Sequence, residues 1–207
     1  MEKEMPARKK IRLDGYDYSQ AGYYWITICV ENRHEILSHV VGAGSSRPRT
    51  QSRPYTQPRP QDNAKIQLSP YGEIAKKYIE ELPVKYPNVK IDKYVIMPNH
   101  IHMILIISHI NWIYDRGWVR GRGWVQGRGW VQGRENPAPT TVSSMIGWYK
   151  YQTTKEINNF NGGTIEKIWQ RSFQDEIIRN ENAYQNIWRY IEENPAKWVE
   201  DDYFVKK

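Results

Sequence analysis

The alternation of apolar and polar residues predicts several strands separated by helices. The run YYWITICV at 23–30 is rich in β-branched and aromatic residues and predicts a buried strand. The stretch 89–107, VKIDKYVIMPNHIHMILII, predicts two strands joined at Met97–Pro98–Asn99. The second of them, at His100–Ile107, is apolar enough to be central in a sheet. A further strand is expected within 165–178.

Three helices are predicted between and after these strands. The first begins with Ser69 as cap and Pro70 at the first helical position, and Pro83 is its expected end. Its apolar residues recur at helical spacing: Ile74, Tyr78, Ile79 and Leu82. The others span about 141–159 and 180–194, before Pro195. The resulting order, β-α-β-β-α-β-α, predicts an α+β fold: a ferredoxin-like antiparallel sheet with helices on one face.

Two low-complexity loops interrupt this pattern, which otherwise predicts a single domain over residues 1–207. Residues 42–62 read GAGSSRPRTQSRPYTQPRPQD and are expected to form a disordered basic loop, because they cannot bury apolar area. Residues 113–137 contain the tandem hexapeptides RGWVRG, RGWVQG and RGWVQG, units too short for a solenoid. This repeat is either an arm whose Arg and Trp contact phosphates and bases, or a repeat expansion in a tolerant loop.

Composition favours a nucleic-acid partner. Thirty Lys and Arg against 23 Asp and Glu give a net charge of +7, which attracts polyanions. Nine Trp and fifteen Tyr against three Phe suit stacking on unpaired bases, or they replace Phe in the core; composition alone does not decide between these. A single cysteine, Cys29, excludes an intramolecular disulfide and a Cys-based zinc site. No apolar run has the length of a signal peptide or a membrane span, so we expect a cytoplasmic protein without a membrane partner.

His100 and His102 are separated by one residue in a predicted strand. Side chains alternate between faces, so the two imidazoles lie on one face about 6.6 Å apart along the strand and can converge on one cation. The alternative is two polar residues on a half-exposed strand. A divalent Mg²⁺ or Mn²⁺ held there would polarise a phosphodiester, and histidine ligands favour Mn²⁺.

The last predicted helix carries Tyr190 and Asn194 at i and i+4, on one helical face. A tyrosine can act as a nucleophile and form a covalent intermediate. Such a link would store the bond energy of a cut strand, so rejoining would need no external energy source. Taken alone, however, Tyr190 is more simply a core or interface tyrosine.

Four segments resemble one family: YYWITICVENR at 23–33, YVIMPNHIHMIL at 94–105, IWQRSF with EIIRNE within 168–181, and RYIEENPAKW at 189–198. The chain resembles the REP-associated tyrosine transposases, relatives of the small single-tyrosine insertion-sequence transposases. The combination of MPNHIH with a distant YIxxNPxKW is specific, whereas either motif alone is weak. The resemblance implies an HUH transposase fold with His100, His102 and Asn194 as metal ligands and Tyr190 as the catalytic residue.

The resemblance also implies an activity: a transposase or endonuclease that cuts and rejoins single-stranded DNA beside hairpins. Such enzymes form a 5′-phosphotyrosine link and release a 3′-OH, as monomers or homodimers. Arg171, Arg179 and Lys197 are candidate DNA contacts near the site, with ordinary surface charge as the alternative. Where many relatives carry aromatic-Tyr-Asp-His, this chain has Phe173–Gln174–Asp175–Glu176, so Gln and Glu replace the Tyr and His that could contact DNA or metal from that strand.

Two other functions remain open from the sequence. The same fold could serve a non-catalytic hairpin DNA- or RNA-binding protein with a vestigial metal site. The four residues His100, His102, Tyr190 and Asn194 are all present, which argues against lost activity. A replication or plasmid-transfer initiator shares the chemistry, but such proteins usually carry additional domains.

Overall fold

The computed structural model describes residues 16–42, 64–108 and 141–205. Its centre is a four-stranded antiparallel sheet in the order β4-β5-β1-β6. The strands are β1 (Gly22–Cys29), β4 (Val89–Ile96), β5 (His100–Ile107) and β6 (Gln174–Ile178). β5 has a strand on each side and is buried along its whole length, which agrees with its apolar sequence.

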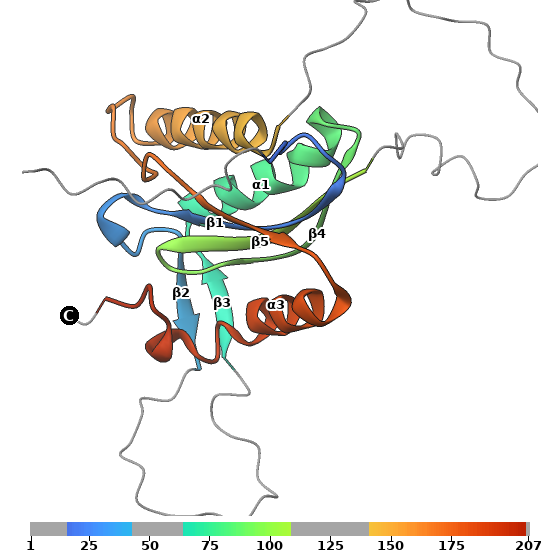
Figure 1. The fold of residues 1–207 in the computed structure, drawn as a ribbon. Coiled ribbons are helices and arrows are strands. Elements are labelled where there is room, and N and C mark those ends of the chain that lie inside the picture. Colours follow the sequence, from blue (N-terminus) through green and yellow to red (C-terminus); the bar gives the residue numbers. More distant parts are fainter. Residues whose placement is uncertain (1–15, 43–63, 109–140, 206–207) are drawn as a thin grey trace, which may run out of the picture.

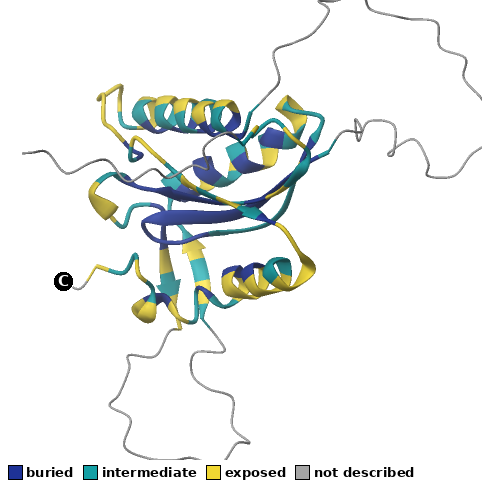
Figure 2. Cartoon of the chain, viewed as in Figure 1, coloured by how far each residue is buried: buried dark blue, intermediate teal, exposed yellow. Residues whose placement is uncertain are grey.

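The helices lie on both faces of the sheet (Figure 1). Helices α1 (Pro70–Lys85) and α2 (Val142–Phe160) cover one face, and α3 (Glu181–Glu193) covers part of the other. The larger core lies between the sheet and α1 and α2, and a smaller one joins β5 and β6 to α3. Figure 2 shows the buried strands between these layers. Among the described residues, no helix is long and apolar enough to cross a membrane.

The predicted α+β class is confirmed, and the predicted element order is reproduced apart from two additional strands, β2 and β3. The position of α3 also differs from the prediction. The prediction of helices on one face is correct for α1 and α2, whereas α3 packs on the opposite face through Ile187 and Ile191. An apolar helical stripe requires an apolar partner but does not specify which face of the sheet supplies it. β5 is apolar on both faces and presents Ile104 and Ile106 to α3.

Two local features depart from the predicted pattern. Helix α1 continues past Pro83 to Lys85. Pro83 stands in the last turn, where its missing N–H costs one helical hydrogen bond, and the Tyr86 N–H still donates to the Leu82 carbonyl at 2.8 Å. The structure also contains an unpredicted hairpin of β2 (Ser38–Val41) and β3 (Lys65–Leu68).

The two predicted low-complexity loops lie outside the described residues, apart from Gly42 at the start of the first. Gly42 has a φ of 82°, in the region that glycine adopts most easily.

Gly72 in the first turn of α1 allows a close approach between the helix and the segment before β2. A Cβ at this position would lie 2.0 Å from the Leu37 carbonyl oxygen, a backbone atom that cannot rotate away. We therefore expect Gly72→Ala to lower the free energy of unfolding by roughly 2–4 kcal/mol in urea titrations. The matched control is Gly147→Ala on the exposed side of α2, where a Cβ meets nothing within 4 Å. The control should gain roughly 0.5–1 kcal/mol, and equal stability of both variants would contradict the close approach.

Candidate active site

The two histidines lie at the start of β5 on the sheet face that α3 covers. Their rings are fully buried, with centroids 4.5 Å apart, so the structure places them together as the strand periodicity predicts. The alternating residues Ile101 and Met103 point into the larger core on the other face. The reading of two polar residues on a half-exposed strand is wrong, because both imidazoles are buried.

A hydrogen bond on Nδ1 orients each imidazole. His100 Nδ1 lies 2.9 Å from Asn99 Oδ1, and His102 Nδ1 lies 2.8 Å from Thr27 Oγ1 on β1. His100 Nε2 is buried and has no hydrogen-bond partner among the described residues. Metal-ligating histidines typically bind through one nitrogen while a protein group holds the other. The arrangement therefore leaves His100 Nε2 for a ligand, while His102 Nε2 faces the Tyr190 hydroxyl at 3.5 Å.

Burial keeps both histidines neutral. Desolvation lowers the pKa of His100 well below its usual value, and the neighbouring His102 and Arg33 lower it further. Desolvation also lowers the pKa of His102 to about 4, although the Asp201 carboxylate partly opposes this shift. A neutral imidazole has the free lone pair that metal coordination requires.

Helix α3 brings Tyr190 to the histidines. Its hydroxyl lies 3.5 Å from His102 Nε2 and donates a hydrogen bond to Asp201 Oδ2 at 3.1 Å. Its ring packs edge-on against Trp25, with centroids 5.5 Å apart. The residue is 37% exposed and borders a hollow of about 200 Å³ that Asn194 and Asp201 also line. Part of the Tyr190 side chain is therefore accessible from this hollow.

Asp201 completes this group, and sequence reasoning missed it. The ligand atoms of His100, His102 and Asp201 all lie within 4.8 Å of one another. Asp201 comes from the segment after α3, and its Oδ2 also accepts a hydrogen bond from Asn194 Nδ2 at 2.8 Å. The end of the helix near Pro195 indicates a change of chain direction, but no spacing in the sequence indicates which later carboxylate returns to the strand.

The donor set fits a divalent cation. Asn194 Oδ1 is buried and, like His100 Nε2, has no partner among the described residues. Leaving such buried polar atoms unsatisfied costs free energy that a bound ion would recover. His100 and His102 supply nitrogen, while Asp201 and Asn194 offer oxygen, a combination that suits Mn²⁺ and, less strongly, Mg²⁺.

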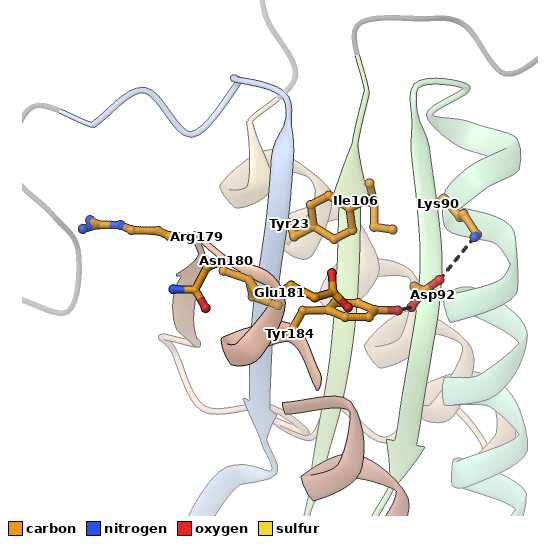
Figure 3. A pocket seen from close by; sticks show the side chains of 9 residues that line it. Tyr23, Lys90, Asp92, Ile106, Arg179, Asn180, Glu181 and Tyr184 are labelled. Carbon is orange, nitrogen blue, oxygen red and sulfur yellow. Dashed lines mark hydrogen bonds and ion pairs between the residues drawn. The ribbon is translucent and has the colours of Figure 1, made fainter. Parts of the chain in front are cut away.

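The three predicted DNA contacts lie in different places. Lys197 borders the hollow beside Tyr190 and forms an ion pair with Glu193 at 2.6 Å. Arg179 lines another pocket, at the amino end of α3, and its side chain extends away from Tyr23 and Tyr184 (Figure 3). Arg171 lines a groove beside α2. The structure thus brings only Lys197 of these three to the Tyr190 hollow.

The buried histidines predict a pH-dependent stability of the metal-free protein. As the pH falls from 6.5 to about 4, the His102 imidazole takes up a proton in the unfolded chain but not in the folded chain. The free energy of unfolding therefore decreases over this range. Between pH 7 and pH 4.5 His102 alone should account for roughly 2–3 kcal/mol of lost unfolding free energy. In urea titrations with chelator present, the unfolding free energy of His102→Gln should change less steeply with pH than that of the wild type. His39→Gln, at an exposed position in β2, is the control, and an equal slope in all three proteins would contradict the prediction.

Comparison with known proteins supports the fold. No protein-family profile matches the chain. An uncharacterized protein of Haemophilus influenzae is 29% identical over 199 residues, 96% of this chain and 93% of that protein. The solved structure of a REP-associated tyrosine transposase bound to a REP hairpin has 18% identity and a TM-score of 0.52, over 91% of this chain and 76% of that one. The resemblance to these transposases is thereby confirmed at the level of the fold.

Proposed function

We propose that this protein is a metal-dependent transposase or nuclease that cuts and rejoins single-stranded DNA through Tyr190. The proposal rests on the position of the Tyr190 hydroxyl, which lies 3.5 Å from His102 Nε2. The ring of His102 in turn packs against that of His100, the second neutral histidine, with centroids 4.5 Å apart. A partly exposed phenol next to a buried group of potential metal ligands suits nucleophilic attack on a phosphodiester.

The proposed reaction is a transesterification. The Tyr190 oxygen attacks the scissile phosphorus, the bond from phosphorus to O3′ breaks, and a 5′-phosphotyrosine link and a 3′-OH result. Burial and the nearby Asp201 carboxylate raise the pKa of Tyr190, so the phenol is protonated before reaction. Asp201 Oδ2, which already accepts the hydroxyl hydrogen bond at 3.1 Å, takes the proton, and the leaving oxygen is protonated by water. Attack by a 3′-OH on the link reverses these steps and rejoins the strand.

His100 and His102 would hold the divalent cation, Mg²⁺ or Mn²⁺, with Asn194 or Asp201 as an oxygen ligand. The bound ion would offset the charge that develops on the phosphate oxygens. If Asp201 were the ligand, its carboxylate would serve both the ion and the Tyr190 hydroxyl, which donates to Oδ2 at 3.1 Å.

The proposed substrate is single-stranded DNA next to a hairpin. The structurally similar transposase was solved with a REP hairpin, and the basic charge of this chain suits a polyanion. Lys197 is the proposed contact at the cleavage site because it borders the Tyr190 hollow. Arg171 and Arg179 would contact DNA further away. The protein would act as a monomer or a homodimer.

A covalent-capture assay tests the function. Labelled hairpin oligonucleotides with single-stranded extensions, taken from DNA that flanks the gene, are incubated with Mn²⁺ or Mg²⁺ and separated on a denaturing gel. A protein–DNA band that disappears in chelator is expected. Tight binding of several hairpins without any adduct would instead support the non-catalytic hairpin-binding protein.

A further inference from the structure

The chain after α3, here called the return segment (residues 198–205), folds back over the histidines and carries Asp201. The rings of Trp198 and Tyr203 lie 5.9 and 4.5 Å from the ring of His100. From residue 201 onward the return segment belongs to no helix or strand. Its position therefore depends on contacts with neighbouring elements.

The Asp201 carboxylate is held at both oxygens. Its Oδ2 accepts hydrogen bonds from Tyr190 at 3.1 Å and from Asn194 Nδ2 at 2.8 Å. Its Oδ1 accepts the backbone N–H of Tyr203 at 2.7 Å. A group that takes up a proton during a reaction must stay within hydrogen-bond reach of the donor. The orientation of Oδ2 toward Tyr190 therefore depends on where Tyr203 lies.

Arg33 and Asn99 fix the return segment on the side away from α3. Arg33 Nη1 donates to the Asp202 carbonyl at 2.9 Å, and the guanidinium carbon lies 5.0 Å from the centroid of the Tyr203 ring. That distance allows a cation–π interaction. Asn99 Nδ2 donates to the Tyr203 carbonyl at 2.8 Å. Because Asn99 also orients His100 through Oδ1, Arg33 is the residue whose replacement keeps this histidine hydrogen bond.

The turn that presents Arg33 is strained. It forms η1 (Glu31–Arg33), between β1 and β2, and Asn32 and Arg33 have φ values of 52° and 56°. Residues other than glycine rarely adopt this left-handed region, and it persists where the surrounding structure enforces it. Asn99 Nδ2 donates to the Arg33 carbonyl at 3.3 Å as well, so one amide joins the turn to the return segment.

We propose that Arg33 is a positioning residue that holds Asp201 in place to accept the Tyr190 proton. The inference rests on the proposed function, which assigns the proton to Asp201. Arg33 contacts the two residues that follow Asp201, while Asn194 holds the carboxylate from the end of α3. Arg33 thus acts through Asp201 and needs no contact with the DNA.

The rate of adduct formation at saturating DNA tests this role. Arg33→Ala should slow the reaction by roughly 10–100-fold, since a displacement of about 1 Å at a reacting group can cost that much. The DNA dissociation constant and its salt dependence should stay near wild type. Arg33→Lys keeps a cation for the Tyr203 ring and a donor for the Asp202 carbonyl, so it should recover most of the rate. The matched control is Lys85→Ala, which removes one positive charge from the last turn of α1, on the other face of the sheet.

Three results would overturn the proposal. An unchanged rate in Arg33→Ala would show that Asp201 does not depend on Arg33. A faster rate would show that the return segment obstructs the site. An unchanged rate at saturating DNA, combined with weaker binding and a salt slope lower by about 1, would make Arg33 a phosphate contact instead.

Amide hydrogen exchange, measured by NMR without DNA, separates this proposal from the proposed function. The N–H groups of Asp201, Tyr203 and Phe204 all donate to acceptors within the return segment. They should exchange roughly 10-fold faster or more in Arg33→Ala, while the amides of α2 exchange as in the wild type. Unchanged exchange in the return segment would overturn the proposal. If the wild type forms no adduct, the proposed cleavage fails, whereas exchange still decides whether Arg33 holds Asp201 in place.

Discussion

Tyr190→Phe should abolish the covalent protein–DNA adduct and leave DNA binding close to wild type. The substitution removes only the oxygen that would attack phosphorus, and removal of a nucleophile typically costs roughly 10⁴-fold or more in rate. The remaining phenyl ring can keep its edge-on contacts with Trp25 and His102, so the fold and the hollow should persist. Gel capture of the adduct and fluorescence anisotropy of the labelled oligonucleotide measure the two effects separately.

Tyr203 provides a matched control, because it is a second tyrosine beside the histidines. Its ring lies 4.5 Å from that of His100, but its hydroxyl donates to Gln174 Oε1 at 2.9 Å. Tyr203→Phe should therefore retain the adduct. Adduct formation by Tyr190→Phe together with its loss in Tyr203→Phe would assign the nucleophile to Tyr203 and refute the proposed role of Tyr190.

The parts of the site that lie within one regular element could be predicted from the sequence. The i, i+2 spacing of His100 and His102 is enough to place both side chains on one strand face. The i, i+4 spacing of Tyr190 and Asn194 likewise places both residues on the same side of α3. Such relations depend only on helix and strand periodicity, and the structure reproduces them: Tyr190 and Asn194 both donate to Asp201 Oδ2.

The parts that depend on tertiary packing could not be predicted. Asp201 reaches the histidines only because the chain folds back after α3, and no periodic pattern links residues 100 and 201. The position of α3 on the opposite face depends on apolar residues that β5 presents to both sides. The hairpin of β2 and β3 consists of two strands of 4 residues each, separated by the low-complexity segment. Although β3 alternates between polar and apolar residues, a run of this length is too short to predict a strand by itself.

His100→Ala should remove both tight divalent-metal binding and metal-dependent adduct formation. Metal ligands bind through fixed donors, and His100 Nε2 is a buried nitrogen with no described protein partner, so its loss removes one of the ion's nitrogen donors. We expect at least a roughly 100-fold weaker affinity for Mn²⁺ by calorimetry, since even second-shell changes cost roughly 10–100-fold. Circular dichroism checks the fold, because the substitution also deprives Asn99 Oδ1 of its hydrogen bond.

The same calorimetry distinguishes the two candidate oxygen ligands. Asp201→Asn keeps the size of the side chain but removes its charge, and Asn194→Ala removes the buried, unpartnered Oδ1. If Asp201 is the ligand, Asp201→Asn should weaken Mn²⁺ binding more than Asn194→Ala; the reverse order assigns the ligand to Asn194. In that second case Asp201 acts on Tyr190 alone, so Asp201→Asn slows adduct formation while Mn²⁺ affinity stays near wild type. Wild-type Mn²⁺ affinity in His100→Ala would show that the ion does not bind at the histidines, and the metal-dependent mechanism would have to be abandoned.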